Sequence, residues 1–127
     1  MFNYATVGSN RLEEAKRFYD ELLGPIGMTP MMDHGSGGRI YRSADNRLFG
    51  VLGPFDGQPA SAGNGTMFGF MLDSRDKVSA MHARAIELGG ACEGAPGLRG
   101  PAEANNFAAY FRDLDGNKLC AICMGAG

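Results

Sequence analysis

Residues whose side chains can act as nucleophiles or metal ligands are few in this chain and lie far apart. The two histidines fall in a glycine-rich loop, at His34, and inside a predicted helix, at His82, where a solvent-facing or locally bonded ring is expected. Cys120 and Cys123 have C-x-x-C spacing, but residues three apart on a strand point to opposite faces, so the two thiols cannot chelate one ion. No base or cation stands next to Cys120, which favours a small apolar filler over a nucleophile.

The bulk composition describes an ordinary globular protein and argues against several classes. The chain has 127 residues, of which 44% are hydrophobic and 20% charged, enough for one domain with its own core. A net charge of −2 argues against a nucleic-acid-binding protein, which would carry a basic face. No apolar run approaches the ~20 residues that cross a bilayer, and the first residues lack a signal-peptide pattern. We therefore expect a cytoplasmic protein without membrane contact, and the odd count of three cysteines predicts free thiols.

The first half of the chain predicts a strand, an amphipathic helix and three further short strands. Residues 2–8 alternate as a strand does, and apolar residues then recur at three- and four-residue spacing from Asn10 to Leu23. Asn10 and Glu13 form a predicted capping box at the start of this helix, and Gly24-Pro25 ends it. The next strands are expected at Met28–Met32, Arg39–Ser43 and Leu48–Leu52.

The second half of the chain repeats this order. A strand at Thr66–Leu72 precedes a helix at Ser74–Leu88, whose apolar positions lie sixty-six residues after those of the first helix. A short strand at Ala91–Glu93, a loop at Gly94–Asn106 and a hairpin from Tyr110 to Cys123 follow. The duplication predicts one domain over residues 1–127, made of unit one at about 1–57, a linker at about 58–65 and unit two at about 66–127.

The closing hairpin has the most informative local chemistry. In its turn, Asp113-Leu114-Asp115-Gly116-Asn117, Asp and Asn bond their own backbone and Gly accepts a positive φ. This FRDLDGNKL segment resembles the signature of the glyoxalase/bleomycin-resistance/extradiol-dioxygenase (vicinal oxygen chelate) superfamily, with Leu114 where Pro is usual. Tyr4-Ala5-Thr6-Val7-Gly8 and the helix exit at Gly24–Met28 are also similar, so the resemblance covers essentially the whole chain.

The resemblance implies an α+β fold in which two βαβββ units form a curved mixed-sheet cup with the helices outside. A ferredoxin-like fold, which also repeats βαβ units, is the minor alternative. Superfamily enzymes hold a divalent metal in the cup with one residue from each of four strands. Carried onto this sequence, those positions fall on Tyr4, Phe49, Met67 and Cys120.

These four residues are a poor set of metal ligands. A Tyr phenol must first lose a proton with a pKa of about 10, a Met thioether suits only soft ions, and a Phe ring offers no donor atom. One Cys thiolate without His or carboxylate partners does not make a zinc site. We therefore predict no metal and no other cofactor, with Cu(I) held by Cys120 and Met67 as the alternative.

A superfamily fold without its metal site predicts a binding protein for a small, largely apolar or aromatic molecule, as in the resistance-type members. Residues without fixed charge would line the cup: Tyr4, Thr6, Phe49, Met67, Tyr110 and Cys120. A metal-dependent glyoxalase-like lyase or dioxygenase is the alternative function, and a structural or regulatory partner with an empty cup is a third. Members of this size usually pair, so we expect a homodimer.

Overall fold

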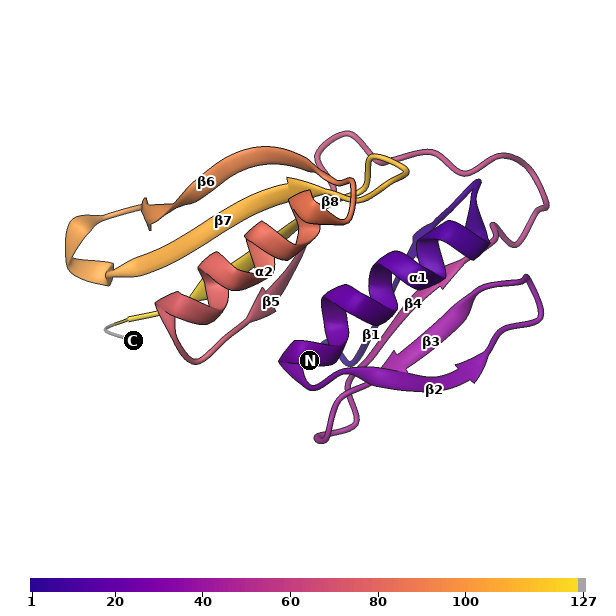
Figure 1. Ribbon diagram of the computed structural model, residues 1–127, viewed down its shortest axis with the longest axis horizontal. Helices are drawn as coiled ribbons and strands as arrows, with labels where there is room; N and C mark the ends of the chain where they lie inside the picture. Colours follow the sequence, from indigo (N-terminus) through magenta and orange to yellow (C-terminus); the bar gives the residue numbers. More distant parts are fainter. Residues whose placement is uncertain (126–127) are drawn as a thin grey trace. The chain divides into compact units, whose positions relative to one another are not determined.

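The computed structural model describes residues 1–125 and divides into two compact units, Met1–Asn64 and a second unit that begins at Gly65 (Figure 1). Each unit contains a strand, an α-helix and then three strands, which is the predicted βαβββ order. Each unit has a four-stranded sheet with both parallel and antiparallel pairs, so the α+β class is confirmed. None of the described helices is long and apolar enough to cross a membrane.

In the first unit, α1 (Leu12–Leu23) lies against a sheet with the strand order β1-β4-β3-β2. β1 and β4 pair in parallel, whereas β4 with β3 and β3 with β2 pair antiparallel. A turn of 3-10 helix, η1 (Gly24–Ile26), follows α1 at the predicted Gly24-Pro25 stop. The strands span Tyr4–Gly8 (β1), Thr29–Asp33 (β2), Arg39–Arg42 (β3) and Leu48–Leu52 (β4).

The core of the first unit lies between α1 and this sheet. Tyr19 of α1 is fully buried, and its ring centroid lies 5.2 Å from that of Phe49 and 6.4 Å from that of Tyr41. The Tyr41 hydroxyl donates to Asp20 Oδ1 at 2.7 Å, so its one polar side-chain atom stays bonded in the interior. Burying a Phe side chain contributes about 1.5–3 kcal/mol to the free energy of folding, so the Tyr19–Phe49 contact helps to hold α1 on the sheet.

The start of α1 differs from the prediction. The helix begins at Leu12, and Arg11 occupies the N-cap position without a capping hydrogen bond from its side chain. Asn10 instead exchanges two hydrogen bonds with the backbone of Ala60: Nδ2 donates to the carbonyl at 2.9 Å, and Oδ1 accepts from the N–H at 2.7 Å. The capping box expected of Asn10 and Glu13 is therefore wrong, because a loop distant in sequence takes the Asn10 amide.

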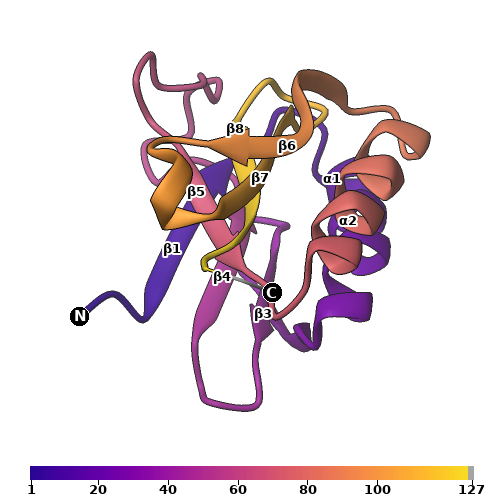
Figure 2. The ribbon, with the colours of Figure 1, turned by 90° about the vertical axis from the view of Figure 1, so that its left-hand side faces the viewer.

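In the second unit, α2 (Arg75–Glu87) lies on one side of a sheet with the strand order β5-β8-β7-β6 (Figure 2). β5 and β8 pair in parallel, and the other neighbours pair antiparallel. Ser74 caps α2, since its Oγ accepts from the Lys77 N–H at 3.2 Å. The remaining elements span Phe68–Met71 (β5), Ala91–Arg99 (β6), Ala102–Ala104 (a 3-10 turn, η2), Asn106–Arg112 (β7) and Lys118–Cys123 (β8).

Strand β6 is longer than predicted. The sequence indicated a strand only at Ala91–Glu93 and a loop at Gly94–Asn106, whereas β6 continues to Arg99. Its pairing with β7 shifts register on both sides of Gly94. A Cβ atom at Gly94 would lie 2.9 Å from Cδ2 of Tyr110, so a glycine typical of loops here permits two strands to approach closely.

The turn between β7 and β8 is the predicted one. Asp113 Oδ1 accepts from the N–H groups of Asp115 and Asn117, each at 2.9 Å, and Asn117 Nδ2 donates to Asp113 Oδ2 at 2.9 Å. Gly116 has φ +88°, the left-handed conformation that favours glycine. The Asp113 side chain therefore closes the hairpin that places β8 beside β7.

Candidate functional site

Each sheet has one face that packs on the helix of its own unit and one that points away, which we call the helix-distal face. In the first unit, Phe49 of β4 contacts Tyr19 of α1. In the second, the ring centroid of Phe111 on β7 lies 6.4 Å from that of His82 on α2. Side chains alternate along a strand, so the neighbours of Phe49 and Phe111 in sequence lie on the helix-distal faces.

On the first sheet, Tyr4 and Thr6 lie on the helix-distal face. They flank Ala5, which is the register partner of Phe49 in β4, and both are exposed. Phe49, predicted as part of the site, is instead buried against α1. The strand register explains this correction, because Phe49 shares its face with Ala5, and the β4 residue opposite Thr6 is Gly50.

On the second sheet, Tyr110 and Cys120 are register partners on β7 and β8 and share the helix-distal face. Gly69 of β5 is the partner of Cys120 on its other side. A Cβ atom at Gly69 would lie 2.9 Å from the Cys120 Sγ, so the thiol points to this same face. The structure thus places two of the predicted site residues, Tyr110 and Cys120, side by side.

Cys123 has the opposite orientation, as predicted. It pairs with Phe107 of β7, and the guanidinium carbon of Arg75, from α2, lies 5.3 Å from the centroid of the Phe107 ring. Cys123 therefore faces the helix, and it cannot join Cys120 in one site. All three cysteines are free thiols, as the sequence predicted.

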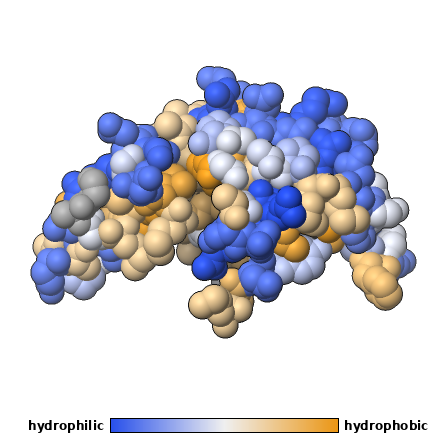
Figure 3. Space-filling model, turned by 90° about the horizontal axis from the view of Figure 1, so that it is seen from below, coloured by the Kyte–Doolittle hydropathy of each residue, from blue (hydrophilic) through white to orange (hydrophobic). Residues whose placement is uncertain are grey.

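Apolar side chains are also exposed in the second unit. Met67, a predicted site residue, immediately precedes β5 and is 43% exposed, and Met71 and Leu98 are more exposed still. Figure 3 shows one face of the molecule, on which hydrophobic residues lie among hydrophilic ones. Flexible thioethers of this kind can adapt to ligands of different shape.

Two cations flank the ring of Tyr110. Lys118 Nζ lies 5.5 Å and the guanidinium carbon of Arg99 lies 5.6 Å from the ring centroid. Lys118 stands two residues before Cys120 and shares its face. The expected lining carried no fixed charge, and the structure places two cations at one of its members, Tyr110. The alternation rule could have placed Lys118, whereas Arg99 lay in a segment predicted to be a loop.

The Arg99 side chain is held in place by its own strand. Its Nη1 donates to the Leu98 carbonyl at 3.1 Å, and its Nη2 donates to the Ala95 carbonyl at 2.6 Å. A cation over an aromatic ring at an exposed position contributes about 0.5–1 kcal/mol, so the contact with Tyr110 adds to this anchoring. The result is an aromatic ring bordered by positive charge.

The Cys120 thiol is expected to be unreactive. It is 5% exposed, and burial raises its pKa above the ordinary range, while the nearby Lys118 charge opposes part of that rise. A thiol with a raised pKa stays protonated at neutral pH, and a protonated thiol is a weak nucleophile and a poor metal ligand. These properties favour a packing role for Cys120 over a catalytic one.

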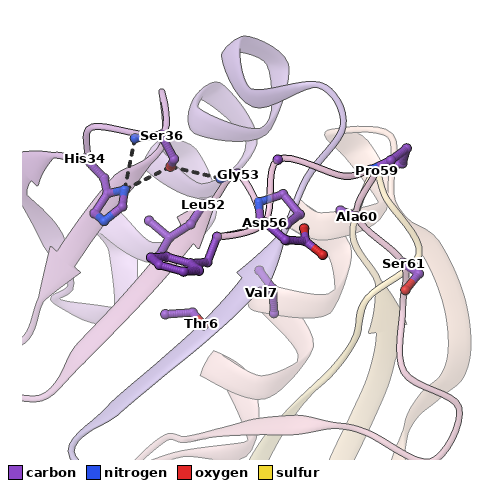
Figure 4. A pocket seen from close by; sticks show the side chains of 14 residues that line it. Thr6, Val7, His34, Ser36, Leu52, Gly53, Asp56, Pro59, Ala60 and Ser61 are labelled. Atoms are coloured by element: carbon purple, nitrogen blue, oxygen red, sulfur yellow. Dashed lines mark hydrogen bonds between the residues drawn. The ribbon is translucent and has the colours of Figure 1, made fainter.

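A hollow of about 770 Å³ lies within the first unit, where β1 and β4 end (Figure 4). Its polar lining residues come from three segments: Thr6 from β1, His34 and Ser36 from the loop between β2 and β3, and Asp56 and Ser61 from the loop after β4. Thr6 is the predicted site residue that lines it. The volume suits a small organic molecule.

His34 and Ser36 are tied together at this hollow. The Ser36 N–H donates to His34 Nδ1 at 3.1 Å, Ser36 Oγ lies 2.9 Å from the same nitrogen, and the Gly53 N–H donates to Ser36 Oγ at 2.9 Å (Figure 4). Because Nδ1 accepts a backbone N–H, the neutral ring carries its proton on Nε2. A locally bonded ring was predicted for His34, but its place at a hollow depends on loops that are distant in sequence.

No group of three or more His, Cys, Asp or Glu side chains within residues 1–125 is placed to hold a metal ion. The side chains at the positions where the resemblance implies ligands carry a phenol (Tyr4), a thioether (Met67) and a protonated thiol (Cys120). The fourth implied position, Phe49, faces α1. These donors do not fit a divalent ion that prefers imidazole and carboxylate ligands.

Comparison with known proteins relates the whole of this arrangement to one family. The model of the Glyoxalase/Bleomycin resistance protein/Dioxygenase superfamily matches residues 1–121. Among solved structures, the chain is similar to a glyoxalase/bleomycin resistance protein from Albidiferax ferrireducens T118, with 44% sequence identity and a TM-score of 0.87 over 97% of this chain and 98% of that chain. A search of curated proteins found no match.

Two more distant structures share the fold. A lactoylglutathione lyase from Agrobacterium tumefaciens is 17% identical, with a TM-score of 0.71 over 97% of this chain and 92% of that chain. A genomically encoded fosfomycin resistance protein from Listeria monocytogenes is 15% identical, with a TM-score of 0.70 over 99% of this chain and 93% of that chain. At these identities the similarity concerns the fold alone.

Proposed function

Because the chain belongs to the Glyoxalase/Bleomycin resistance protein/Dioxygenase superfamily, we propose that it binds a small, largely aromatic molecule that carries an acidic group, and that it does so without a metal ion. One observation carries the proposal: the Tyr110 ring lies beside Cys120 on the helix-distal face, with Lys118 and Arg99 against it. An aromatic surface bordered by cations suits such a ligand.

Binding without a metal is supported by the donor atoms at the implied ligand positions. Tyr4, Met67 and Cys120 offer a phenol, a thioether and a thiol whose pKa is raised by burial. The phenol and the thiol must lose a proton before they can bind a metal ion, and the thioether is too soft a donor for the ions that superfamily enzymes use.

The character of the ligand follows from Tyr110 and its neighbours. Offset stacking of an aromatic ligand on Tyr110 would contribute about 0.5–1.5 kcal/mol beyond the burial of its surface. An acidic group on that ligand would pair with Lys118 or Arg99, which are already held near the ring. The exposed Met67 adds an adaptable apolar contact.

Residues of the first unit enter the proposal through the resemblance. Tyr4 and Thr6 occupy the helix-distal face of their own sheet, and Thr6 also lines the hollow beside His34. We include both as binding residues and leave out Phe49, which packs on α1.

The proposal is tested by titrating the protein with an aromatic carboxylic acid and with its neutral amide in a calorimeter. We expect the acid to bind more tightly, and native mass spectrometry of the purified protein should reveal any co-purifying molecule. Cys120→Trp should abolish binding by filling the face beside Tyr110. Ile86→Trp, on the exposed surface of α2, is the matched control and should bind as the wild type does.

Metal analysis separates this proposal from the enzyme alternative. We expect no stoichiometric Zn, Ni, Mn or Fe in the purified protein, because the implied ligand positions hold Tyr4, Met67 and Cys120. A protein with about one metal ion per chain that is lost on substituting these residues, together with metal-dependent lyase or dioxygenase turnover, would establish the alternative instead.

In the ligand titration, equal affinity for the acid and for the amide would contradict the role proposed for Lys118 and Arg99.

A homodimer is part of the same proposal. It rests on two arguments: superfamily members of this size usually pair, and exposed strand edges tend to associate. β2, the edge strand of the first sheet, is exposed along its whole length, from Thr29 to Asp33. Light scattering should give the mass of two chains at micromolar concentration, and the mass of one chain would contradict the dimer.

A further inference from the structure

A cysteine and a histidine from different elements meet on the second unit, away from the residues of the proposed binding face. Cys92 lies near the start of β6, and its Sγ is 3.2 Å from Nε2 of His82, which lies in the middle of α2. Cys92 is exposed, whereas Cys120 and Cys123 are only 5% and 2% exposed. A thiol that is both accessible and within hydrogen-bond distance of an imidazole is therefore unique among the three.

The imidazole is held in position by the sheet beneath it. The ring of His82 lies edge-on to that of Phe111, at 6.4 Å and 73°, and Phe111 is the register partner of Cys92. Burial lowers the pKa of His82, which keeps the ring neutral at pH 7. A neutral ring has one unprotonated nitrogen that can accept the thiol proton, and the nitrogen that faces Cys92 is Nε2.

The charged residues close to Cys92 and His82 in sequence form ion pairs of their own. Glu93, the neighbour of Cys92 in β6, accepts from Arg112 of β7 at 2.7 Å. Arg84 and Glu87 of α2 pair at 3.5 Å. The contact that distinguishes Cys92 from the other thiols is therefore the one with His82.

We propose that Cys92 is a reactive thiol that exchanges with low-molecular-weight disulfides, and that His82 accepts its proton. The Cys92 S–H proton passes to His82 Nε2, and the thiolate attacks one sulfur of the disulfide R–S–S–R. A new Cys92–S–S–R bond forms as the old S–S bond breaks, and the departing thiolate takes the proton as R–SH. One disulfide is exchanged for another, so no further oxidant is needed.

This site is independent of the proposed ligand-binding function. Cys92 is the register partner of Phe111, which faces α2, whereas Tyr110 and Cys120 lie on the helix-distal face of the sheet. A failure to bind aromatic acids would leave the thiol chemistry untouched, and an unreactive Cys92 would leave ligand binding untouched.

The test follows the reaction of the whole native chain with a chromogenic aryl disulfide and locates the modified cysteine by mass spectrometry. We expect one fast thiol per chain at Cys92, and all three thiols after unfolding in urea. His82→Gln should slow the Cys92 reaction by at least about tenfold, since a positioned base typically contributes a hundredfold or more. His34→Gln, which changes the chain's other histidine, is the matched control and should leave the rate unchanged.

Two further measurements separate proton transfer from a structural role of His82. Imidazole added to the buffer should restore part of the rate of His82→Gln and have little effect on the wild type. Circular dichroism and a melting curve should show that His82→Gln remains folded. The proposal is overturned if native Cys92 reacts no faster than the thiols of the unfolded chain, or if folded His82→Gln reacts as fast as the wild type.

Discussion

Gly69 and Cys120 lie opposite each other on the parallel strands β5 and β8, and the space beside the glycine is filled by the cysteine sulfur. A Cβ atom at Gly69 would lie 2.9 Å from Cys120 Sγ, closer than two such atoms approach in proteins. The absence of a side chain at position 69 therefore lets the thiol sit on the helix-distal face next to Tyr110. This pair connects the packing of β5 with the proposed binding surface.

Gly69→Ala should destabilise the protein by about 1–3 kcal/mol, because the added methyl group must displace the thiol of Cys120 from a packed position. In a Cys120→Ala background the same change should cost much less, since the sulfur that it meets is gone. Urea unfolding of the two single variants and the double variant measures this coupling. Additive effects would show that the two side chains do not compete for the same space.

Asp113→Ala should destabilise the hairpin by about 2–4 kcal/mol, because two backbone N–H groups and the buried Asn117 amide each lose an acceptor. Asp56→Ala is the matched control. Asp56 also accepts from a backbone N–H two residues on, that of Gln58 at 3.0 Å, but it lies in an exposed loop. Its loss should change the free energy of unfolding by less than about 1 kcal/mol. Similar losses in both variants would contradict the role given to the buried turn.

The stability of the protein should fall at alkaline pH through Tyr41. Burial, and then the adjacent Asp20 carboxylate, raise the pKa of Tyr41 well above its ordinary value near 10. Above pH 10 the unfolded chain loses this phenolic proton while the folded chain keeps it, so the folded state binds more protons and the free energy of unfolding declines as pH rises.

Urea unfolding at pH 8 and at pH 10.5 measures that decline. Tyr41→Phe should lower stability at pH 8 by about 1–2 kcal/mol, because the hydroxyl donates to a carboxylate, but it should show a smaller further loss at high pH. Tyr4→Phe is the control, since Tyr4 is 47% exposed. Equal alkaline losses in the wild type and Tyr41→Phe would assign the effect to another group.

Lys118 and Arg99 should strengthen binding through the negative charge of a ligand and not through contact with its aromatic ring. Lys118→Met and Arg99→Met should each weaken binding of an aromatic acid by roughly tenfold and leave binding of the neutral amide nearly unchanged. The effect should shrink as salt is added, because salt screens exposed charges. Calorimetry with both compounds checks this, and equal weakening for acid and amide would indicate a loss of packing instead.

Local sequence patterns determined much of this protein. The alternating residues of the closing hairpin, the Asp113 turn and the start of a helix at Ser74 depend on contacts within a few positions of the chain, so propensity and hydrogen-bonding chemistry were sufficient to place them. The same is true of the opposite orientation of Cys120 and Cys123, which follows from the alternation of a strand. The repeated βαβββ order was visible because each helix has its own apolar face.

Tertiary structure decided the rest, because those features depend on partners that are distant in sequence. Asn10 was a good capping residue until the Ala60 backbone, fifty positions away, took its amide. Phe49 could be assigned to a face only once the pairing of β1 with β4 and the contact with Tyr19 were known. A strand pattern gives two faces, but only packing decides which of them the helix covers.

The two places that we propose can bind or react, the Tyr110 ring with its cations and the Cys92–His82 pair, both depend on contacts between residues distant in sequence. Arg99 reaches Tyr110 because β6 continues past a glycine that is typical of loops, and the bulged register brings the two side chains together. His82 and Cys92 meet because α2 packs over the strand that follows it. The sequence by itself determined which side chains were available, and the register of strands and the packing of helices decided which of them touch.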